Sequence, residues 1–334
     1  MKLIIDALGA DEGAVMVAEA TKLAMERHDF DAVLVGPKNQ MEPILSSYLS
    51  RIEWIDTNEY ITNDEHPVLA IRRKKQSSTV LGLQRLNEPD CDGFLTAGST
   101  GALLAGGYFI TKRIAGIERA CLAAVIPNAA GGTVLVDTGA NMDTTPEILF
   151  QFGTMGAAYM SEVLGRSNPR VGLLNVGAEP GKGDKRTQQA YELLKDSDLN
   201  FVGNIEARGL LDGSCDVLVA DGFSGNVALK TLEGTAKTLF SEIRKGIYSS
   251  TKTKIGGALL KGVFKGIAST YDYKAYGGAP LLGTRKPLYK AHGNSGAQTF
   301  ALAIPELLHY ASSRVEEKIA SRVEGDRKNG TDEN

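Results

Sequence analysis

The stretch that most constrains the fold spans residues 91–113 and reads CDGFLTAGSTGALLAGGYFITKR. Its apolar run predicts a buried strand over residues 93–97, and the small and apolar residues after the GSTG turn predict a packed helix. Such a turn directs unpaired backbone N–H groups and the positive end of the helix dipole at one point. Ser99, Thr100 and Gly101 are therefore candidates for binding a phosphate or an oxyanion. An ordinary capped junction between a strand and a helix would use the same residue types.

Composition narrows the class of protein. The 334 residues are 43% hydrophobic and 23% charged, which is enough to bury the core of one large or two smaller soluble domains. A net charge of -3 argues against a general nucleic-acid binder. Cys91, Cys121 and Cys215 lack C-x-x-C spacing and lie in or beside apolar runs, so we expect reduced core cysteines of a cytosolic protein. The chain shows no secretory leader and no apolar run long enough for a bilayer, so we expect neither secretion nor integral insertion.

Strand and helix patterns alternate along the chain. We expect strands at residues 2–6, 32–35, 52–55, 93–97, 121–126, 133–137, 171–176, 201–205 and 216–220, and one ending near Lys290. Helices are expected at about residues 15–27, after Pro43, from Pro67, from Pro146, up to Lys195, after Asp221 and after Ser295. The NAAGG turn makes residues 121–126 and 133–137 a hairpin. The alternation indicates a mainly parallel sheet covered by helices on both faces.

Two further turns resemble the first in their glycines and hydroxyls. One is DGFSGN at residues 221–226 and the other lies within KAHGNSG at residues 290–296. Because the carboxyl ends of parallel strands lie on one edge of a sheet, we expect the three turns to meet at one crevice. The candidates that these two turns supply are Asp221, Ser224, Gly225, Asn226, Lys290, His292, Gly293, Asn294 and Ser295.

Polar residues elsewhere give weaker signals. Asp137 and Asn141 follow a strand directly, where they can order a substrate or only cap the next helix. The basic run at residues 72–75 is either a solvated helix face or an anion contact, with Arg73, Lys74 and Lys75 as the candidates. The charged tail is expected to be disordered over residues 324–334, which leaves a single unit at residues 1–323.

The stretch at residues 254–267, KIGGALLKGVFKGI, has the pattern of an amphipathic helix within a protruding segment at residues 250–270. Lys254, Lys261 and Lys265 fall on the side opposite the apolar residues, which suits a surface of anionic lipid headgroups. Packing on the protein's own core or on a second subunit fits the same pattern. The predicted membrane contacts are Ile255, Leu259, Leu260, Val263, Phe264 and Ile267.

Over nearly its full length the chain resembles the PlsX-type phosphate acyltransferases of bacterial phospholipid synthesis. The resemblance is carried by IRRKKQSST, TAGSTGALLAGGYFITKRIAGIERACLA, VDTGANMDTTPE, PRVGLLNVG followed by GKG, DVLVADGFSGNVALKTLEG, YGGAPLLG and KAHGNSGA, in this order. Two departures are local. Ala10 stands where the family's DAMGGD has its second glycine, and Ser99 stands where its NTGAL has asparagine.

The resemblance implies a three-layer α/β/α sandwich like that of isocitrate and isopropylmalate dehydrogenases and of phosphotransacetylase, with a cleft between two lobes of each subunit of a homodimer. It implies conversion of long-chain acyl carrier protein thioesters and inorganic phosphate to acyl-phosphate, without cofactor or metal. It also implies a cytoplasmic enzyme on the inner face of the membrane that supplies a membrane-bound glycerol-3-phosphate acyltransferase. We expect Lys290 to stabilise charge and His292 to protonate the departing thiol, with Asp221 and Asn226 beside them.

Other interpretations remain open. A carrier or lipid-binding protein without catalysis, or a phosphate acyltransferase that uses coenzyme A, would fit many of the same residues. A nicotinamide-dependent dehydrogenase fits less well, because the first strand–helix turn has no G-x-G-x-x-G and no acidic cluster suits a hydroxy-acid metal site. The sequence also has no G-x-S-x-G elbow and no P-loop.

Overall fold

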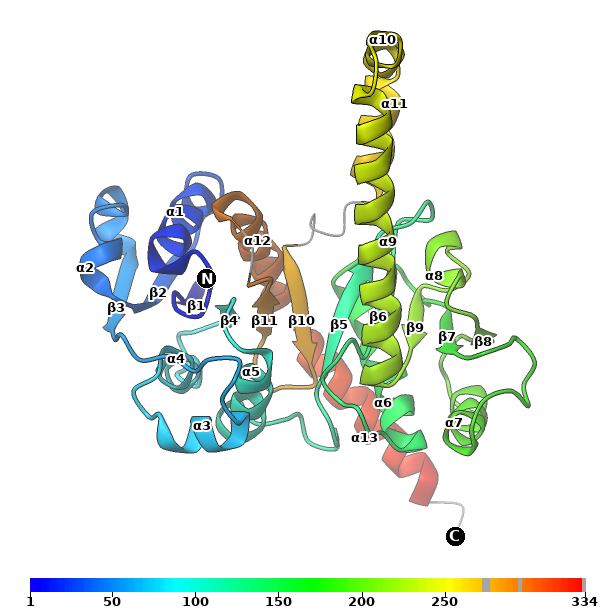
Figure 1. The fold of residues 1–334 in the computed structure, drawn as a ribbon. Helices are drawn as coiled ribbons and strands as arrows, with labels where there is room; N and C mark the ends of the chain where they lie inside the picture. The colour runs from blue at the N-terminus through cyan, green and yellow to red at the C-terminus, as the bar shows by residue number, and fades with distance from the viewer. Residues whose placement is uncertain (272–276, 294–295, 332–334) are drawn as a thin grey trace.

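The computed structural model describes residues 1–271, 277–293 and 296–331, and its strands form an eleven-stranded sheet in the order β3-β2-β1-β4-β11-β10-β5-β6-β9-β7-β8 (Figure 1). The strands are β1 Lys2–Asp6, β2 Asp31–Gly36, β3 Ile52–Asp56, β4 Gly93–Thr96, β5 Cys121–Ile126, β6 Thr133–Val136, β7 Val171–Leu174, β8 Phe201–Ile205, β9 Val217–Val219, β10 Gly278–Leu282 and β11 Leu288–Ala291. The helices that cover them are α1 Gly13–Met25, α2 Lys38–Met41, α3 Pro67–Arg73, α4 Ser78–Leu86, α5 Thr100–Gly106, α6 Pro146–Glu162, α7 Lys185–Lys195, α8 Gly209–Asp212, α9 Gly222–Tyr248, α10 Thr251–Leu259, α11 Lys261–Thr270, α12 Ala297–Ser313 and α13 Val315–Thr331.

Strand direction reverses near the middle of the sheet. β3, β2, β1, β4 and β11 are mutually parallel, and so are β6, β9, β7 and β8. Between the two sets, β10 is antiparallel to β11 and to β5, and β5 forms the predicted hairpin with β6. The two parallel sets therefore run in opposite directions. Most pairs are parallel, as predicted, but the carboxyl ends of β4 and β9 lie at opposite edges of the sheet.

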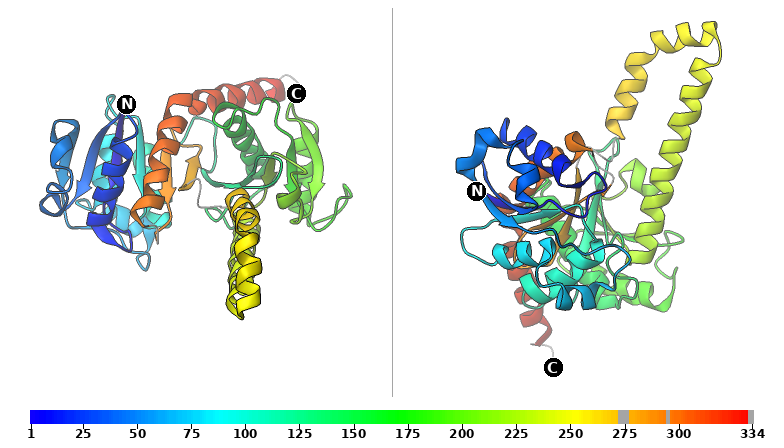
Figure 2. Two further views of the ribbon diagram at one scale, coloured as in Figure 1. Left: turned by 90° about the horizontal axis from the view of Figure 1, so that it is seen from above. Right: turned by 60° about the vertical axis from the view of Figure 1, so that its left-hand side comes forward.

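Alternating side chains bury both faces of the first set of strands. Leu3 and Ile5 of β1 join a core cluster with residues of α1 and α12, whereas Ile4 between them joins a second cluster with residues of α4 and α5. Since neighbouring side chains of a strand point to opposite faces, these two helix pairs cover opposite sides of the sheet. The layered arrangement is visible from above in Figure 2.

The second set of strands follows the same rule. Val134 and Val136 of β6 pack in the cluster that contains the α6 side chains, and Leu135 packs with Leu210 of α8 and Leu229 of α9. Helices thus cover both faces of this half as well. The predicted α/β sandwich is confirmed.

α9, α10 and α11 form an arm that projects from the body, with α9 and α11 as its two legs and α10 across the top (Figure 2). The prediction of a single amphipathic helix over residues 254–267 is wrong in one respect. The backbone leaves the helical conformation at Leu260, where φ is -90° and ψ is 3°, so that α10 and α11 are separate helices. A Cβ on Gly257 would lie 2.5 Å from Ile247, so this glycine lets α10 approach α9 closely.

Two other predictions differ from the structure. The helix expected after Pro43 is present as a 3₁₀ helix, Ser46–Arg51, rather than an α-helix. A further short helix, α2, precedes Pro43, where the Asp56 carboxylate accepts a hydrogen bond from the Lys38 N–H at 2.9 Å and caps it. α13 extends to Thr331, past the point at which we expected disorder. Val315, Ile319 and Val323 recur every four residues and are buried in the main core, which accounts for a continuous helix.

Candidate active site

A cavity of about 420 Å³ opens between the two halves of the sheet. β10 and β5 pair only at Leu281↔Leu122 and Leu282↔Cys121, and beyond these pairs the two strands diverge around the cavity. It is lined by Gly9, Asp11, Asn63, Ala97, Gly98, Thr100, Leu122, Ala124, Val125, Ile126, Thr138, Gly139, Asn226, Leu229, Lys230, Glu233, Gly278, Ala279, Lys290, Ala291, His292 and Gly293.

Lys290 is one of the two lysines among the residues that line this cavity. It lies near the end of β11 opposite Thr96 of β4, and its Nζ donates to the carbonyl of Ala97 at 3.0 Å and to that of Ala291. Burial lowers the pKa of its ammonium group to about 8, although Asp6 and Asp11 oppose this shift. A desolvated ammonium that is held by two carbonyls is a pre-oriented partner for an anion.

Asp6 holds the polar groups beside Lys290 in place, a role that the sequence analysis did not assign. Its buried carboxylate accepts hydrogen bonds from the hydroxyls of Thr79 and Thr96 at 2.9 and 3.0 Å. The Thr96 hydroxyl in turn accepts from the Gly98 N–H at 2.9 Å. Burial raises the pKa of Asp6, and these donors oppose the shift. The available signal was an acidic residue directly after the apolar run of residues 3–5.

The predicted turn before α5 contributes unequally to the cavity. Thr100 lines it and is half-buried. The Ser99 hydroxyl instead caps α5, accepting from the Ala102 N–H at 3.4 Å, so serine fills the capping position where the family has asparagine. A Cβ on Gly101 would lie 2.5 Å from Pro67, which makes Gly101 a packing residue between α5 and α3. Thr100 is therefore the member of the trio that lines the cavity.

The turn after β11 lies on the same side of the cavity as the turn before α5. His292 and Gly293 line it, and the Gly293 carbonyl accepts from the Asp11 N–H at 3.0 Å. Ala10, next to Asp11, has no positive φ, so the methyl group where the family has glycine causes no backbone strain. Asn294 and Ser295 lie outside the described residues.

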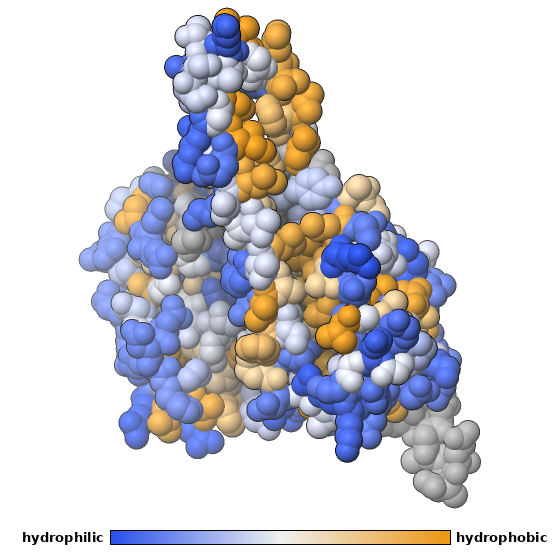
Figure 3. Space-filling view, turned by 45° about the vertical axis from the view of Figure 1, so that its right-hand side comes forward, coloured by the Kyte–Doolittle hydropathy of each residue, from blue (hydrophilic) through white to orange (hydrophobic). Residues whose placement is uncertain are grey.

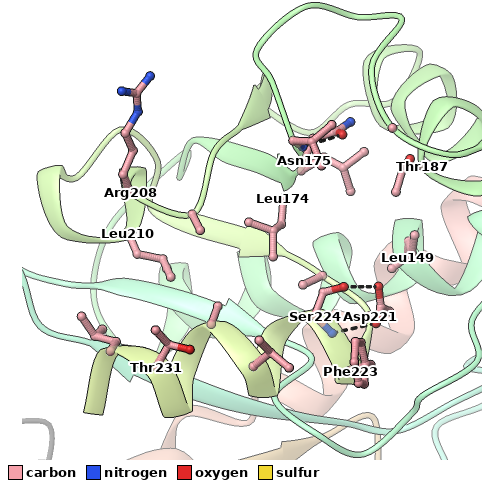
Figure 4. Close-up of a pocket in the computed structure, with 18 of the residues that line it drawn as sticks. Leu149, Leu174, Asn175, Thr187, Arg208, Leu210, Asp221, Phe223, Ser224 and Thr231 are labelled. Atoms are coloured by element: carbon pink, nitrogen blue, oxygen red, sulfur yellow. Dashed lines mark hydrogen bonds between the residues drawn. The ribbon is translucent and has the colours of Figure 1, made fainter. Parts of the chain in front are cut away.

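The turn before α9 divides between two cavities. Asn226 lines the cavity of Lys290, but Asp221 and Ser224 line a second cavity of about 920 Å³ among α7, α8 and α9 (Figure 4). The division follows the faces of α9, because Ser224, Val227 and Thr231 line the larger cavity whereas Asn226, Leu229 and Glu233 line that of Lys290. Asp221 caps α9 by accepting from Ser224 and also accepts from Arg186 at 3.0 Å. The prediction that all three turns converge is correct for two of them and for Asn226 alone in the third.

Gly225 serves packing rather than binding. A Cβ at this position would lie 1.9 Å from the carbonyl oxygen of Asp137, so α9 can start here only without a side chain. Asp137 itself is fully buried and accepts hydrogen bonds from the backbone N–H groups of Leu122, Ala140 and Asn141. Burial raises its pKa, while the Asn141 amide and those N–H groups oppose the shift.

Asp137 and Asn141 thus hold their loop in shape, since the Asn141 Nδ2 donates to Asp137 at 2.9 Å and to the Ala120 carbonyl at 2.8 Å. Neither lines the cavity, whereas their neighbours Thr138 and Gly139 do. Thr138 and Gly139 of this loop therefore replace Asp137 and Asn141 as candidates for contact with a substrate.

The basic run and the cysteines lie elsewhere. Lys74 pairs with Glu65 at 2.7 Å, and none of Arg73, Lys74 and Lys75 lines the cavity in the part of the chain that the structure describes. The three cysteines are buried and unpaired. Within the described ranges no three His, Cys, Asp or Glu side chains are grouped closely enough to hold a metal ion, and no helix there has the length and apolarity to cross a bilayer.

The fold is that of the phosphotransacetylases. The phosphotransacetylase of Streptococcus pyogenes superposes with a TM-score of 0.61 at 17% identity, covering 95% of this chain and 94% of its own. A branched-chain phosphotransacylase from Enterococcus faecalis gives a TM-score of 0.58 at 12% identity, covering 93% of this chain and 99% of its own. These likenesses show that the chain shares the α/β fold of the phosphotransacetylases.

Sequence similarity defines the family more closely. The model of the family described as "Fatty acid synthesis protein" matches residues 1–318. A phosphate acyltransferase of Oceanobacillus iheyensis is 44% identical over 325 residues, which cover 97% of this chain and 98% of its own. One from Clostridium novyi is 42% identical over 328 residues, which cover 97% and 99%. The chain belongs to the fatty acid synthesis protein family.

Proposed function

We propose that this phosphate acyltransferase takes a long-chain acyl group from the thioester of acyl carrier protein and transfers it to inorganic phosphate. The observation that carries the proposal is Lys290, a half-buried ammonium held by backbone carbonyls in a cavity between the two halves of the sheet. Phosphate is an oxygen nucleophile and a thioester is already activated, so positioning and charge stabilisation suffice for the reaction.

In the proposed reaction, a phosphate oxygen attacks the thioester carbon while Lys290 balances the negative charge. The carbon–oxygen bond forms, the carbon–sulfur bond breaks, and the sulfur leaves as a thiol after it receives a proton. His292, two residues beyond Lys290 in the cavity, is the proposed donor of that proton. Thr100 and Asn226 supply a hydroxyl and an amide for the phosphate oxygens from the two sides of the cavity.

Incubating the chain with palmitoyl carrier protein and phosphate, then trapping acyl-phosphate with hydroxylamine, tests the reaction. Hydroxamate formation that requires both substrates supports it. Binding of the acyl carrier protein without hydroxamate would instead support a carrier or lipid-binding protein. Equal or better turnover of palmitoyl coenzyme A would support the coenzyme A-dependent alternative.

We also propose that the enzyme is a homodimer that contacts the inner face of the cell membrane through its arm. Leu259 and Val263 are 83% and 57% exposed, and hydrophobic surface gathers along one side of the arm (Figure 3). Ile255, Leu260 and Ile267 are exposed as well, but Phe264 is half-buried and turns toward α9. Five of the six predicted contacts are thus available to a membrane, where the labile product would pass to a glycerol-3-phosphate acyltransferase.

A further inference from the structure

A narrow apolar groove of about 260 Å³ continues from the catalytic cavity toward the arm. Ile126, Leu229 and Glu233 line both spaces, so the groove and the cavity adjoin at these residues, which we call the neck. Beyond the neck the groove runs between α9 and the lower end of α11, where Ala236, Phe240 and Ile267 line it. We call it the α9–α11 groove.

One face of α9 connects the two spaces. Asn226, Leu229 and Glu233 lie on the cavity side of this face, and Ala236 and Phe240 continue it at intervals of three and four residues. Residues with this spacing are neighbours on a helix surface. From Leu229 to Phe240 the face is about 16 Å long at 1.5 Å per residue. One leaflet of a bilayer holds its acyl chains in a similar depth of about 15 Å.

The chemistry of the lining changes along this path. The cavity presents Lys290, Asp11 and Thr100, whereas the groove is almost wholly apolar. Its carboxylate, Glu233, is already paired with the ammonium of Lys230 at 2.7 Å. A polar end joined to an apolar end matches a thioester with a long hydrocarbon tail, and an apolar space of this kind does not retain water.

We infer that the α9–α11 groove binds the acyl chain of the substrate and that its depth sets the preferred chain length. The inference rests on the proposed function, because it places the thioester carbon in the cavity of Lys290. The acyl chain enters at the neck between Ile126 and Leu229 and extends along α9 past Ala236. Phe240 marks the far end of the groove and also lines the space inside the arm.

A chain-length series tests the inference. Carrier protein loaded with octanoyl, dodecanoyl or hexadecanoyl groups is compared as substrate for the unaltered enzyme, for Ala236→Phe and for Thr238→Phe. Each methylene that enters the groove improves kcat/KM about fourfold, since its burial is worth about 0.8 kcal/mol. Ala236→Phe fills the groove, so we expect it to remove the gain from dodecanoyl to hexadecanoyl and to retain the octanoyl rate. Thr238→Phe, an exposed position of α9 outside the groove, retains the full series.

Two results would overturn the inference. One is an unchanged hexadecanoyl rate in Ala236→Phe, and the other is an equal loss on every chain length in a variant whose circular dichroism is native. If Ala236→Phe does not fold, Ala236→Leu replaces it and is expected to lower the hexadecanoyl rate selectively by a smaller factor.

A photochemical experiment separates this inference from the reaction itself. Carrier protein bearing an acyl chain with a terminal diazirine is irradiated with the enzyme, and the labelled peptides are mapped. We expect labels on Leu229, Ala236, Leu239 or Phe240, which line the groove but not the 920 Å³ cavity. Labels confined to the 920 Å³ cavity around Asp221 would place the chain there and reject the groove. Labelled α9 without hydroxamate formation would reject the proposed reaction while the acyl site stands.

Discussion

The ammonium of Lys290 donates to the carbonyl of Ala97 at 3.0 Å, and this contact joins the end of β11 to the turn after β4. The two strands are parallel neighbours in the sheet, with Lys290 opposite Thr96. The cation is therefore positioned by the same sheet edge that presents Thr100. The pairing of β11 with β4 thus places the ammonium of Lys290 and the turn before α5 next to each other.

Replacing this cation with a neutral side chain of similar length should impair the reaction. For Lys290→Met we expect kcat to fall about 100-fold or more, the usual cost of losing one group that stabilises a developing oxyanion. Hydroxylamine trapping under saturating phosphate gives the measurement. Lys185→Met, at an exposed position of α7, is the control and should keep the native rate. Native turnover by Lys290→Met would remove Lys290 from the chemistry.

The same residue should make stability depend on pH. Burial lowers the pKa of Lys290 to about 8 from its ordinary value of 10.5, so between these values the unfolded chain binds more protons than the folded one. The free energy of unfolding must then rise with pH across that window, by up to about 3 kcal/mol. Urea titrations of the native protein and of Lys290→Met should diverge by this amount as the pH rises. A difference in the free energy of unfolding that does not change with pH would contradict the lowered pKa of Lys290.

Two glycines of α9 should respond in opposite ways to alanine. Gly225→Ala places a Cβ 1.9 Å from the carbonyl oxygen of Asp137, so we expect a loss of several kcal/mol or a failure to fold. Gly234→Ala, on the same helix with no atom within 4 Å of its added Cβ, should gain about 1 kcal/mol from helix propensity. Thermal unfolding monitored by circular dichroism distinguishes the two. Similar effects at both positions would show that the start of α9 is less tightly packed than the structure has it.

Removing the Asp137 carboxylate should damage the fold more directly than substrate affinity. Asp137→Ala leaves the N–H groups of Leu122, Ala140 and Asn141 without their acceptor, and we expect a loss of about 3 kcal/mol or more. The Michaelis constant for phosphate, measured below the melting temperature of the variant, should change little. A stable variant with a strongly raised constant would restore the substrate-binding role that the sequence suggested.

The apolar side of the arm should determine vesicle binding. Leu259→Glu combined with Val263→Glu places two charges on exposed positions, so binding to anionic vesicles should be lost while activity on carrier protein in solution is kept. Vesicle flotation and the trapping assay measure the two properties. The control is Lys252→Gln, an exposed position of α10 outside the apolar side. If the double variant instead unfolds or dissociates, the surface belongs to a protein interface.

The residue pattern predicted the alternation of strands and helices because buried strands and amphipathic helices have characteristic periods. It did not reveal β10, whose GAPLL sequence carries a glycine and Pro280 and resembles a turn. β10 is antiparallel to both of its neighbours, so missing it concealed part of the reversal of strand direction between the two halves of the sheet.

At the site, residue type identified the correct turns but not the direction of each side chain. Thr100, Asn226, Lys290, His292 and Gly293 line the cavity as expected. Ser99, Gly101, Gly225 and Asp137 share the same motifs but are used for capping, packing and loop support. Glycines, hydroxyls and acids of these motifs either line the cavity or support the fold, and only the three-dimensional contacts distinguish the two roles.

α9 begins beside the cavity of Lys290 and ends at the top of the arm without a break. From Asn226 to Tyr248 it spans about 33 Å at 1.5 Å per residue. The length of this helix therefore fixes the distance between the cavity of Lys290 and any surface that the top of the arm touches. Adding or deleting whole helical turns in α9 would change that distance in steps of about 5.4 Å while keeping the orientation of the arm.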